Sequence, residues 1–123
     1  MGFVAERKKR SKQVNVRLNS ADAEHFNHIK NTMLHQTVSD SVRDLIRQGY
    51  LHLKNLKQSD VDNIMRNLPV ENEEEVKEFQ LNVRLNDDEV RMTDELIKRM
   101  RCGSISTAIR NLINIYHFSM TDG

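Results

Sequence analysis

Hydrophobic and polar residues alternate in two short segments that lie far apart in the chain. Residues 13–18 read Gln-Val-Asn-Val-Arg-Leu, and residues 80–85 read Gln-Leu-Asn-Val-Arg-Leu. Successive side chains of a β-strand point to opposite faces, so each segment sorts into an apolar face and a face of glutamine, asparagine and arginine. The alternation predicts strands at residues 12–18 and 79–85.

After each predicted strand the spacing of apolar residues becomes helical. Ser20 and Asp87 are the expected N-caps of these helices, because short polar side chains can accept hydrogen bonds from the first turn. The apolar positions are Ala23, Phe26, Ile29, Met33 and Leu34 in the first half, and Val90, Leu96, Ile97 and Met100 in the second.

A second helix is predicted in each half. Thr37 or Ser39 is the expected cap in the first half, and Ser104 or Ser106 in the second. Cys102-Gly103 is expected to form the turn before the latter, because glycine tolerates positive φ at a helix end. The apolar faces are Val38, Val42, Leu45 and Ile46, and then Ile105, Ile109, Leu112, Ile113 and Tyr116.

The two halves align at an offset of 67 residues. Residues 14–46 and 81–113 are identical at Asn15, Val16, Arg17, Leu18, Asn19, Met33, Ser39, Arg43, Leu45 and Ile46. Apolar positions also match in character, as Val38 does with Ile105. The pattern indicates an internal duplication of a strand-helix-helix unit.

The residues between the halves form a connector. Gly49-Tyr50 is expected to follow the second helix, although three leucines (Leu51, Leu53 and Leu56) could extend it. Ser59 is the expected cap of a short helix that Pro69 ends, with Val61, Ile64, Met65 and Leu68 on its apolar face. The acidic residues 70–78 are expected to be linker.

Composition favours a small helix-rich protein. The chain has 123 residues, 30% charged and 37% hydrophobic, with one proline and no tryptophan. No apolar run is long enough to span a membrane, and no secretory signal is visible. The single cysteine, Cys102, excludes a disulfide within the chain, so a reducing cytoplasmic setting is expected.

Charge is unevenly distributed although the net value is only +1. Residues 71–79 are acidic, whereas residues 1–20 are basic. Residues 1–11 are expected to form an arm that contacts DNA phosphates, with a solvated tail as the simpler alternative. The basic residues concerned are Arg7, Lys8, Lys9, Arg10 and, at the start of the strand, Lys12.

The polar strand faces point to DNA as a partner. Arginine pairs with the acceptors of guanine, and asparagine and glutamine can bind adenine through two hydrogen bonds. An ordinary water-facing ribbon would favour lysine, glutamate and threonine instead. The candidate base-reading residues are Gln13, Asn15, Arg17, Gln80, Asn82 and Arg84.

The repeated Gln-x-Asn-x-Arg strand, followed each time by two amphipathic helices, resembles the ribbon-helix-helix family to which the Arc and MetJ repressors belong. The resemblance covers residues 12–50 and 79–117. It implies an antiparallel ribbon that enters the major groove, backed by four helices. It also implies phosphate binding at the start of each second helix, at Thr37, Val38 and Ser39 and at Ser104, Ile105 and Ser106.

The chain departs from most of the family because it holds two units. This tandem form is similar to the TraY proteins of F-type conjugative plasmids, and the resemblance implies a prokaryotic cytoplasmic protein associated with the nucleoid or a plasmid. Because an unpaired strand is unstable in water, we expect the two strands to pair within one chain. The expected fold is mainly α with a two-stranded antiparallel β-ribbon: an arm at 1–11, units at 12–50 and 79–118 forming one pseudo-twofold domain, and a connector at 51–78.

The expected function is sequence-specific binding of double-stranded DNA at a short, near-palindromic major-groove site. A transcriptional regulator and an accessory protein at a plasmid transfer origin both remain open, as does cooperative binding of further copies on adjacent sites. The alternative is an antitoxin whose acidic connector binds a toxin while the ribbon binds its own promoter. It is disfavoured because antitoxins of this family usually carry a long polar tail, whereas this chain ends soon after the second unit. For Arg43 and Arg110, an ion pair and a phosphate contact are both open.

Neither catalysis nor a bound metal or cofactor is expected. Cys102 has no histidine near it in the sequence with which to form a catalytic pair. His25 and His28 lie three residues apart on one predicted helix, but no cysteine or carboxylate constellation supports a metal site. The histidines are therefore expected on a solvated surface.

Overall fold

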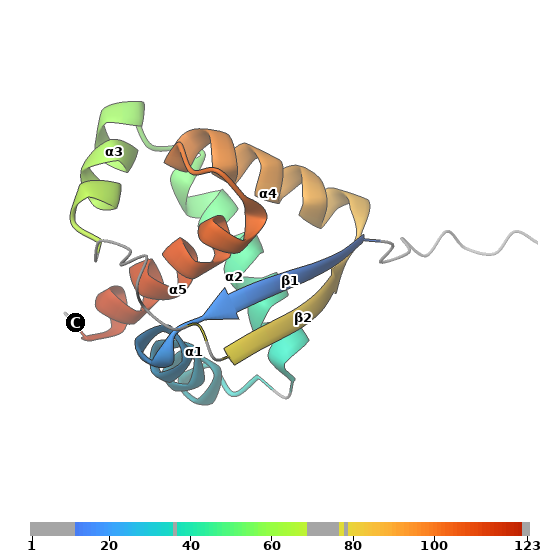
Figure 1. The fold of residues 1–123 in the computed structure, drawn as a ribbon. Coiled ribbons are helices and arrows are strands. Elements are labelled where there is room, and N and C mark those ends of the chain that lie inside the picture. The colour runs from blue at the N-terminus through green and yellow to red at the C-terminus, as the bar shows by residue number, and fades with distance from the viewer. Residues whose placement is uncertain (1–11, 36, 69–76, 78, 122–123) are drawn as a thin grey trace, which may run out of the picture.

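The computed structural model describes residues 12–35, 37–68, 77 and 79–121. In these ranges the chain runs β1 (Lys12–Leu18), α1 (Ser20–Thr32), α2 (Val38–Leu53), α3 (Gln58–Arg66), β2 (Phe79–Leu85), α4 (Asp87–Met100) and α5 (Ile105–Thr121). The fold is mainly helical with a two-stranded antiparallel sheet, as predicted (Figure 1). The basic arm, apart from Lys12, and most of the acidic linker lie outside the described residues.

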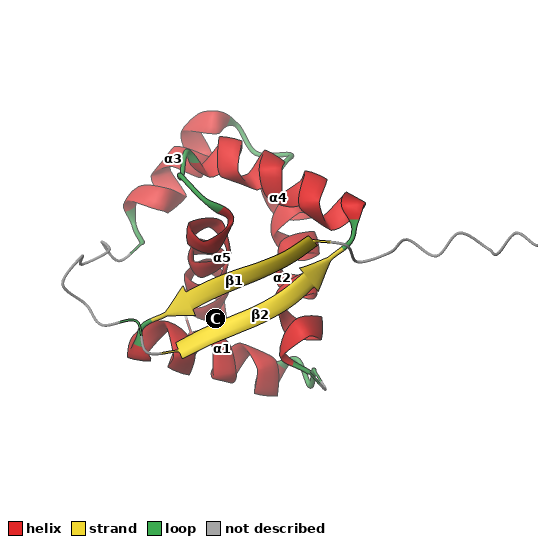
Figure 2. Cartoon of the chain, turned by 45° about the vertical axis from the view of Figure 1, so that its right-hand side comes forward, coloured by secondary structure: helices red, strands yellow, loops and turns green. Residues whose placement is uncertain are grey.

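Both predicted strands are present with the predicted bounds, and they pair with each other. Their register is centred on Asn15, which faces Asn82, while Gln13 faces Arg84 and Arg17 faces Gln80. Figure 2 shows the two strands side by side across one face of the helices. The pairing joins segments separated by more than sixty residues, so the sheet depends on the helices to bring the strands together.

The apolar face of the ribbon forms one wall of the core. Val16 and Leu85 are fully buried, and Val83 is nearly so. α5 contacts β1 and α2 contacts β2, while α1 packs mainly against α5 and α4 mainly against α2. Each half therefore completes the core of the other, and neither half encloses its own apolar residues.

The predicted caps of the first helices are wrong by one residue. Asn19, not Ser20, caps α1, and Asn86, not Asp87, caps α4. Each asparagine side chain accepts a hydrogen bond from the amide three residues on, and the acid there, Asp22 or Glu89, accepts one from the asparagine amide. This reciprocal capping box satisfies two backbone donors at once, which a serine without the return contact would not do.

The turns between helices also differ from the prediction. Gly103 does not have positive φ; Arg101 does, at 54°, and Leu34 at the equivalent position of the first half has φ 57°. The Arg101 side chain is fixed by an ion pair to Asp62, with Nε 3.1 Å from Oδ1. Leu34, predicted to be in the core, is 85% exposed because it is the turn residue, and Met33 is 42% exposed.

α2 and the connector helix have different bounds from those predicted. α2 continues through Gly49 to Leu53, so Leu51 and Leu53 extend the helix, which was the alternative left open by the sequence; Gly49 faces Leu112 of α5. Val38, predicted on its apolar face, is 37% exposed. α3 begins at Gln58 after Lys57, which makes no side-chain cap, so Ser59 lies inside the helix. α5 extends to Thr121, three residues beyond residue 118, the predicted end of the second unit.

Candidate nucleic-acid interface

The structure places the six predicted base-reading side chains together on the exposed face of the ribbon. All six are exposed, whereas the alternate positions toward the helices are mostly buried. This arrangement follows directly from the strand period of two and from the core that the opposite face contacts. The polar face therefore presents three cross-strand pairs in a continuous surface: Gln13 with Arg84, Asn15 with Asn82, and Arg17 with Gln80.

Arginines lie at opposite ends of this face. Arg17 pairs with Gln80 and Arg84 with Gln13, so the backbone positions of the two arginines are separated by four residue steps, about 13 Å along the ribbon. Neither strand contains an aspartate or a glutamate. Between one end and the centre, Gln80 Nε2 donates to Asn82 Oδ1 at 3.3 Å. The face is thus positive at both ends and amide-rich in the middle.

The outer edges of the ribbon are fixed by the second helices. The Arg17 amide donates to Ser106 Oγ on α5 at 3.4 Å, and Arg43 Nε on α2 donates to the Arg84 carbonyl at 3.1 Å. In a two-stranded ribbon both strands are edges, with backbone groups that the ladder leaves unpaired. These contacts satisfy two such groups and hold the backbone of Arg17 and of Arg84 beside a second helix.

The start of each second helix therefore lies beside the ribbon. Thr37 caps α2, with Oγ1 accepting from the Asp40 amide at 3.0 Å, and Ser104 Oγ accepts from the Thr107 amide at 3.1 Å. Both caps are among the predicted alternatives. Helix N-termini carry a partial positive charge from their unpaired amides, which favours an anion there.

The remaining residues predicted to bind phosphate are less uniform. Thr37, Val38 and Ser104 are exposed, whereas Ser39, Ile105 and Ser106 are half-buried. Lys12 is exposed but belongs to the same strand face as Val14, not to the face of the six candidate base-reading residues. Arg7, Lys8, Lys9 and Arg10 lie outside the described residues.

Two buried carboxylates form ion pairs between helices of the two halves. Asp22 Oδ2 is 2.9 Å from Arg110 Nε, and Asn114 Nδ2 donates to Asp22 Oδ1 at 3.2 Å. Glu89, fully buried, pairs with Arg47, whose Nη2 is 3.0 Å from Oε2. The sequence analysis missed these acids, although an Asn-x-x-Asp/Glu pattern after each strand marks a capping box. They link each first helix to the second helix of the other half.

A histidine cluster lies between α1 and α5. The His25 and His117 rings stack with centroids 3.7 Å apart, and His28 approaches His117 edge-on at 5.7 Å. Burial, followed by repulsion from these neighbours, lowers the pKa of His117. His117 and His25 are half-buried, so the prediction of a solvated surface is wrong for them. In the described part of the chain, no three histidine, cysteine or acidic residues could hold a metal.

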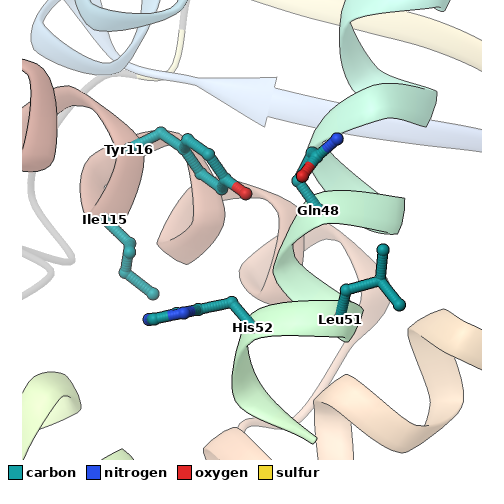
Figure 3. A pocket seen from close by; sticks show the side chains of 5 residues that line it. All are labelled: Gln48, Leu51, His52, Ile115 and Tyr116. Atoms are coloured by element: carbon teal, nitrogen blue, oxygen red, sulfur yellow. The ribbon is translucent and has the colours of Figure 1, made fainter.

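An open pocket of about 390 Å³ lies between the C-terminal halves of α2 and α5. Its lining residues are Gln48, Leu51, His52, Ile115 and Tyr116 (Figure 3). Figure 3 shows the Tyr116 hydroxyl directed toward the Gln48 side chain. Burial, with a contribution from Asp44, raises the pKa of Tyr116 to about 12, so it stays protonated. No strand residue lines this pocket, which separates it from the polar face.

Comparison with known proteins leaves the site to be interpreted from its own geometry. The chain matches no protein-family model, no curated protein and no solved structure. None of the described helices is long and apolar enough to cross a membrane.

Proposed function

We propose that this protein binds double-stranded DNA sequence-specifically, with its two-stranded ribbon in the major groove. The observation that carries the proposal is the symmetric register of six exposed readers: Gln13 faces Arg84, Asn15 faces Asn82 and Arg17 faces Gln80. The major groove admits a two-stranded ribbon, and its base edges match amide and guanidinium groups. A surface that only met water would not need the same three residues twice in mirrored order.

We further propose that the chain is a tandem ribbon-helix-helix protein in which the halves are related by a pseudo-twofold axis. Supporting features recur at the offset of 67 residues: the capping asparagines Asn19 and Asn86, the buried acids Asp22 and Glu89, and the left-handed turn residues Leu34 and Arg101. The axis would pass between Asn15 and Asn82. A DNA site read by such a ribbon is short and nearly palindromic.

Phosphate contacts would flank the base contacts. The starts of α2 and α5 lie beside the ends of the ribbon, where free helix amides attract anions. Arg7 to Lys12 would add sequence-independent attraction on the side from which β1 begins. The interface serves a transcriptional regulator or an accessory protein at a plasmid transfer origin equally, because both roles require the same recognition.

Base selection from a random duplex pool, followed by binding of variants to the selected site, tests the proposal. Arg17→Ala or Arg84→Ala should each weaken specific binding by about 1–3 kcal/mol and relax preference at particular base pairs. Arg66→Ala on α3 is the matched control, since it removes the same charge from an exposed arginine away from the ribbon.

Failure would be clear. If the wild-type chain enriched no sequence from the pool, or if Arg66→Ala weakened specific binding as much as the two reader variants, the ribbon would not be the reading surface. An antitoxin would bind its own promoter as well as a toxin, so enrichment of DNA together with capture of a toxin would favour the antitoxin alternative.

A further inference from the structure

Two arginines at equivalent positions make different contacts. Arg43 on α2 and Arg110 on α5 are separated by the repeat offset of 67 residues. Arg110 is 8% exposed and its Nε lies 2.9 Å from Asp22 Oδ2. Arg43 instead donates from Nε to the Arg84 carbonyl at 3.1 Å, and its Nη1 lies 3.5 Å from Asp40 Oδ1. One arginine stabilises the interior and the other contacts the ribbon.

The residues one helical turn further on explain the difference. Position 114 is asparagine, so the buried Asp22 obtains its positive partner from Arg110. The equivalent position 47 is arginine, and Arg47 reaches the buried Glu89, with Nη2 3.0 Å from Oε2. A buried carboxylate needs a charged partner, and here each has one. Glu89 therefore does not need Arg43, and the Arg43 guanidinium contacts the edge of β2 instead.

The two ends of the ribbon are consequently held by different chemistry. At the Arg84 end, a guanidinium donates to the strand carbonyl. At the Arg17 end, the strand amide donates to the Ser106 hydroxyl, with a longer distance of 3.4 Å. A donor–acceptor distance of 3.1 Å lies within the usual range of an N–H···O hydrogen bond, whereas 3.4 Å lies beyond it, so the contact at the Arg84 end is the stronger one. The backbone that carries Arg84 is thus fixed more firmly than the backbone that carries Arg17.

We propose that Arg43 is a positioning residue for Arg84, so that the chain discriminates bases more sharply beneath Arg84 than beneath Arg17. This inference rests on the proposed DNA binding. It assigns a specificity role to a side chain outside the reading face, and it gives a reason, independent of the N-terminal arm, for one preferred orientation on a nearly symmetric site.

Two substitutions separate the hydrogen bond from the charge. In Arg43→Gln, the glutamine Nε2 lies the same number of bonds from Cα as the arginine Nε, so the donor stays and the charge is lost. In Arg43→Lys, the charge stays but a methylene replaces the donor at that position. Binding of each variant is measured to the selected site and to sites mutated beneath Arg84 or beneath Arg17.

Arg43→Lys should reduce discrimination beneath Arg84 by about three- to tenfold, the range expected for loss of one hydrogen bond. Discrimination beneath Arg17 should be unchanged, and Arg43→Gln should retain the wild-type preference at both ends. Ser106→Ala is the matched variant at the other end, and its smaller effect should fall beneath Arg17. The proposal would be overturned if Arg43→Lys reduced base discrimination equally at both ends or at neither end. It would also be overturned if Arg43→Gln reduced discrimination at one end only.

A second measurement, an NMR chemical shift of the protein without DNA, tests the contact between Arg43 and Arg84 directly. The chemical shift of the Arg84 carbonyl carbon, detected through the Leu85 amide, should move in Arg43→Lys and stay near the wild-type value in Arg43→Gln. If the shift follows this order but the wild-type chain selects no DNA, the proposed function fails while the contact stands. If the shift is the same in Arg43→Lys and the wild type, the positioning role of Arg43 is refuted even where DNA binding is specific.

Discussion

Substitution of Gly49 by alanine tests how closely the two central helices must approach. A Cβ at this position would lie 2.4 Å from Leu112 Cδ2 and 3.4 Å from Leu112 Cγ. Leu112 is only 1% exposed, so its side chain has little room in which to move. Relief of the overlap would require a changed Leu112 rotamer or a wider separation of α2 and α5.

The expected magnitude combines two opposing effects. Overpacking of a well-filled core costs about 1–3 kcal/mol, and an overlap this severe belongs near the upper value. Alanine is favoured over glycine in a helix interior by about 1 kcal/mol. We therefore expect Gly49→Ala to lower the free energy of unfolding by about 2 kcal/mol.

Urea denaturation followed by circular dichroism measures this change. Gly103→Ala is the control, because a Cβ there meets nothing within 4 Å and the residue does not have positive φ. It should be neutral or stabilise slightly. In the double variant Gly49→Ala/Leu112→Ala, the loss should be smaller than the sum of the two single losses, since the smaller side chain makes room. A Gly49→Ala protein as stable as the wild type would refute the reasoning.

Three further predictions concern the core, pH and salt. Arg110→Met should cost about 3–5 kcal/mol in urea denaturation because it leaves the buried Asp22 without its positive partner, whereas Arg91→Met, at an exposed ion pair, should change stability by less than about 0.5 kcal/mol. The pKa of His117 is lowered below 6.5 in the folded state, so the unfolded chain binds more protons as the pH falls. The contribution of neutral His117 to the free energy of unfolding should therefore be fully present above about pH 7.5, decrease as the pH falls through 6.5 and level off below the folded pKa. His117→Gln should flatten this dependence, and an unchanged slope in the variant would contradict the prediction. Deletion of residues 1–10 should weaken binding to all DNA sequences and reduce its salt dependence, and a change of sequence preference with an intact salt slope would show that the arm assignment is wrong.

Local periodicity predicted the elements well. Alternation gave both strands with the observed bounds, because one face of each is buried and the other is not. Ser20 and Asp87 were wrong as caps because the choice depends on a reciprocal contact with Asp22 or Glu89, which a preference for single residues does not include. Leu34 was wrong as a core residue because the helix ends before it, and helical periodicity does not show where a helix stops.

The candidate site was predictable in part. The exposed polar face of the ribbon follows from the strand pattern alone, but the contacts of Arg43 and Arg110 do not. These equivalent arginines differ because Arg47 and Asn114, four residues further on, supply different charges to buried acids on another helix. Only the tertiary arrangement brings those groups together.

The side-chain amide resonances of the protein on DNA test the central claim most directly. In a titration of the labelled chain with its selected duplex, the NH₂ signals of Gln13, Asn15, Gln80 and Asn82 should shift or broaden first. The signals of three exposed residues away from the ribbon should stay in place: Gln48 on α2, Asn63 on α3 and Asn67, which follows α3. Shifts confined to the second group, with the four strand amides unchanged, would show that the ribbon does not read DNA.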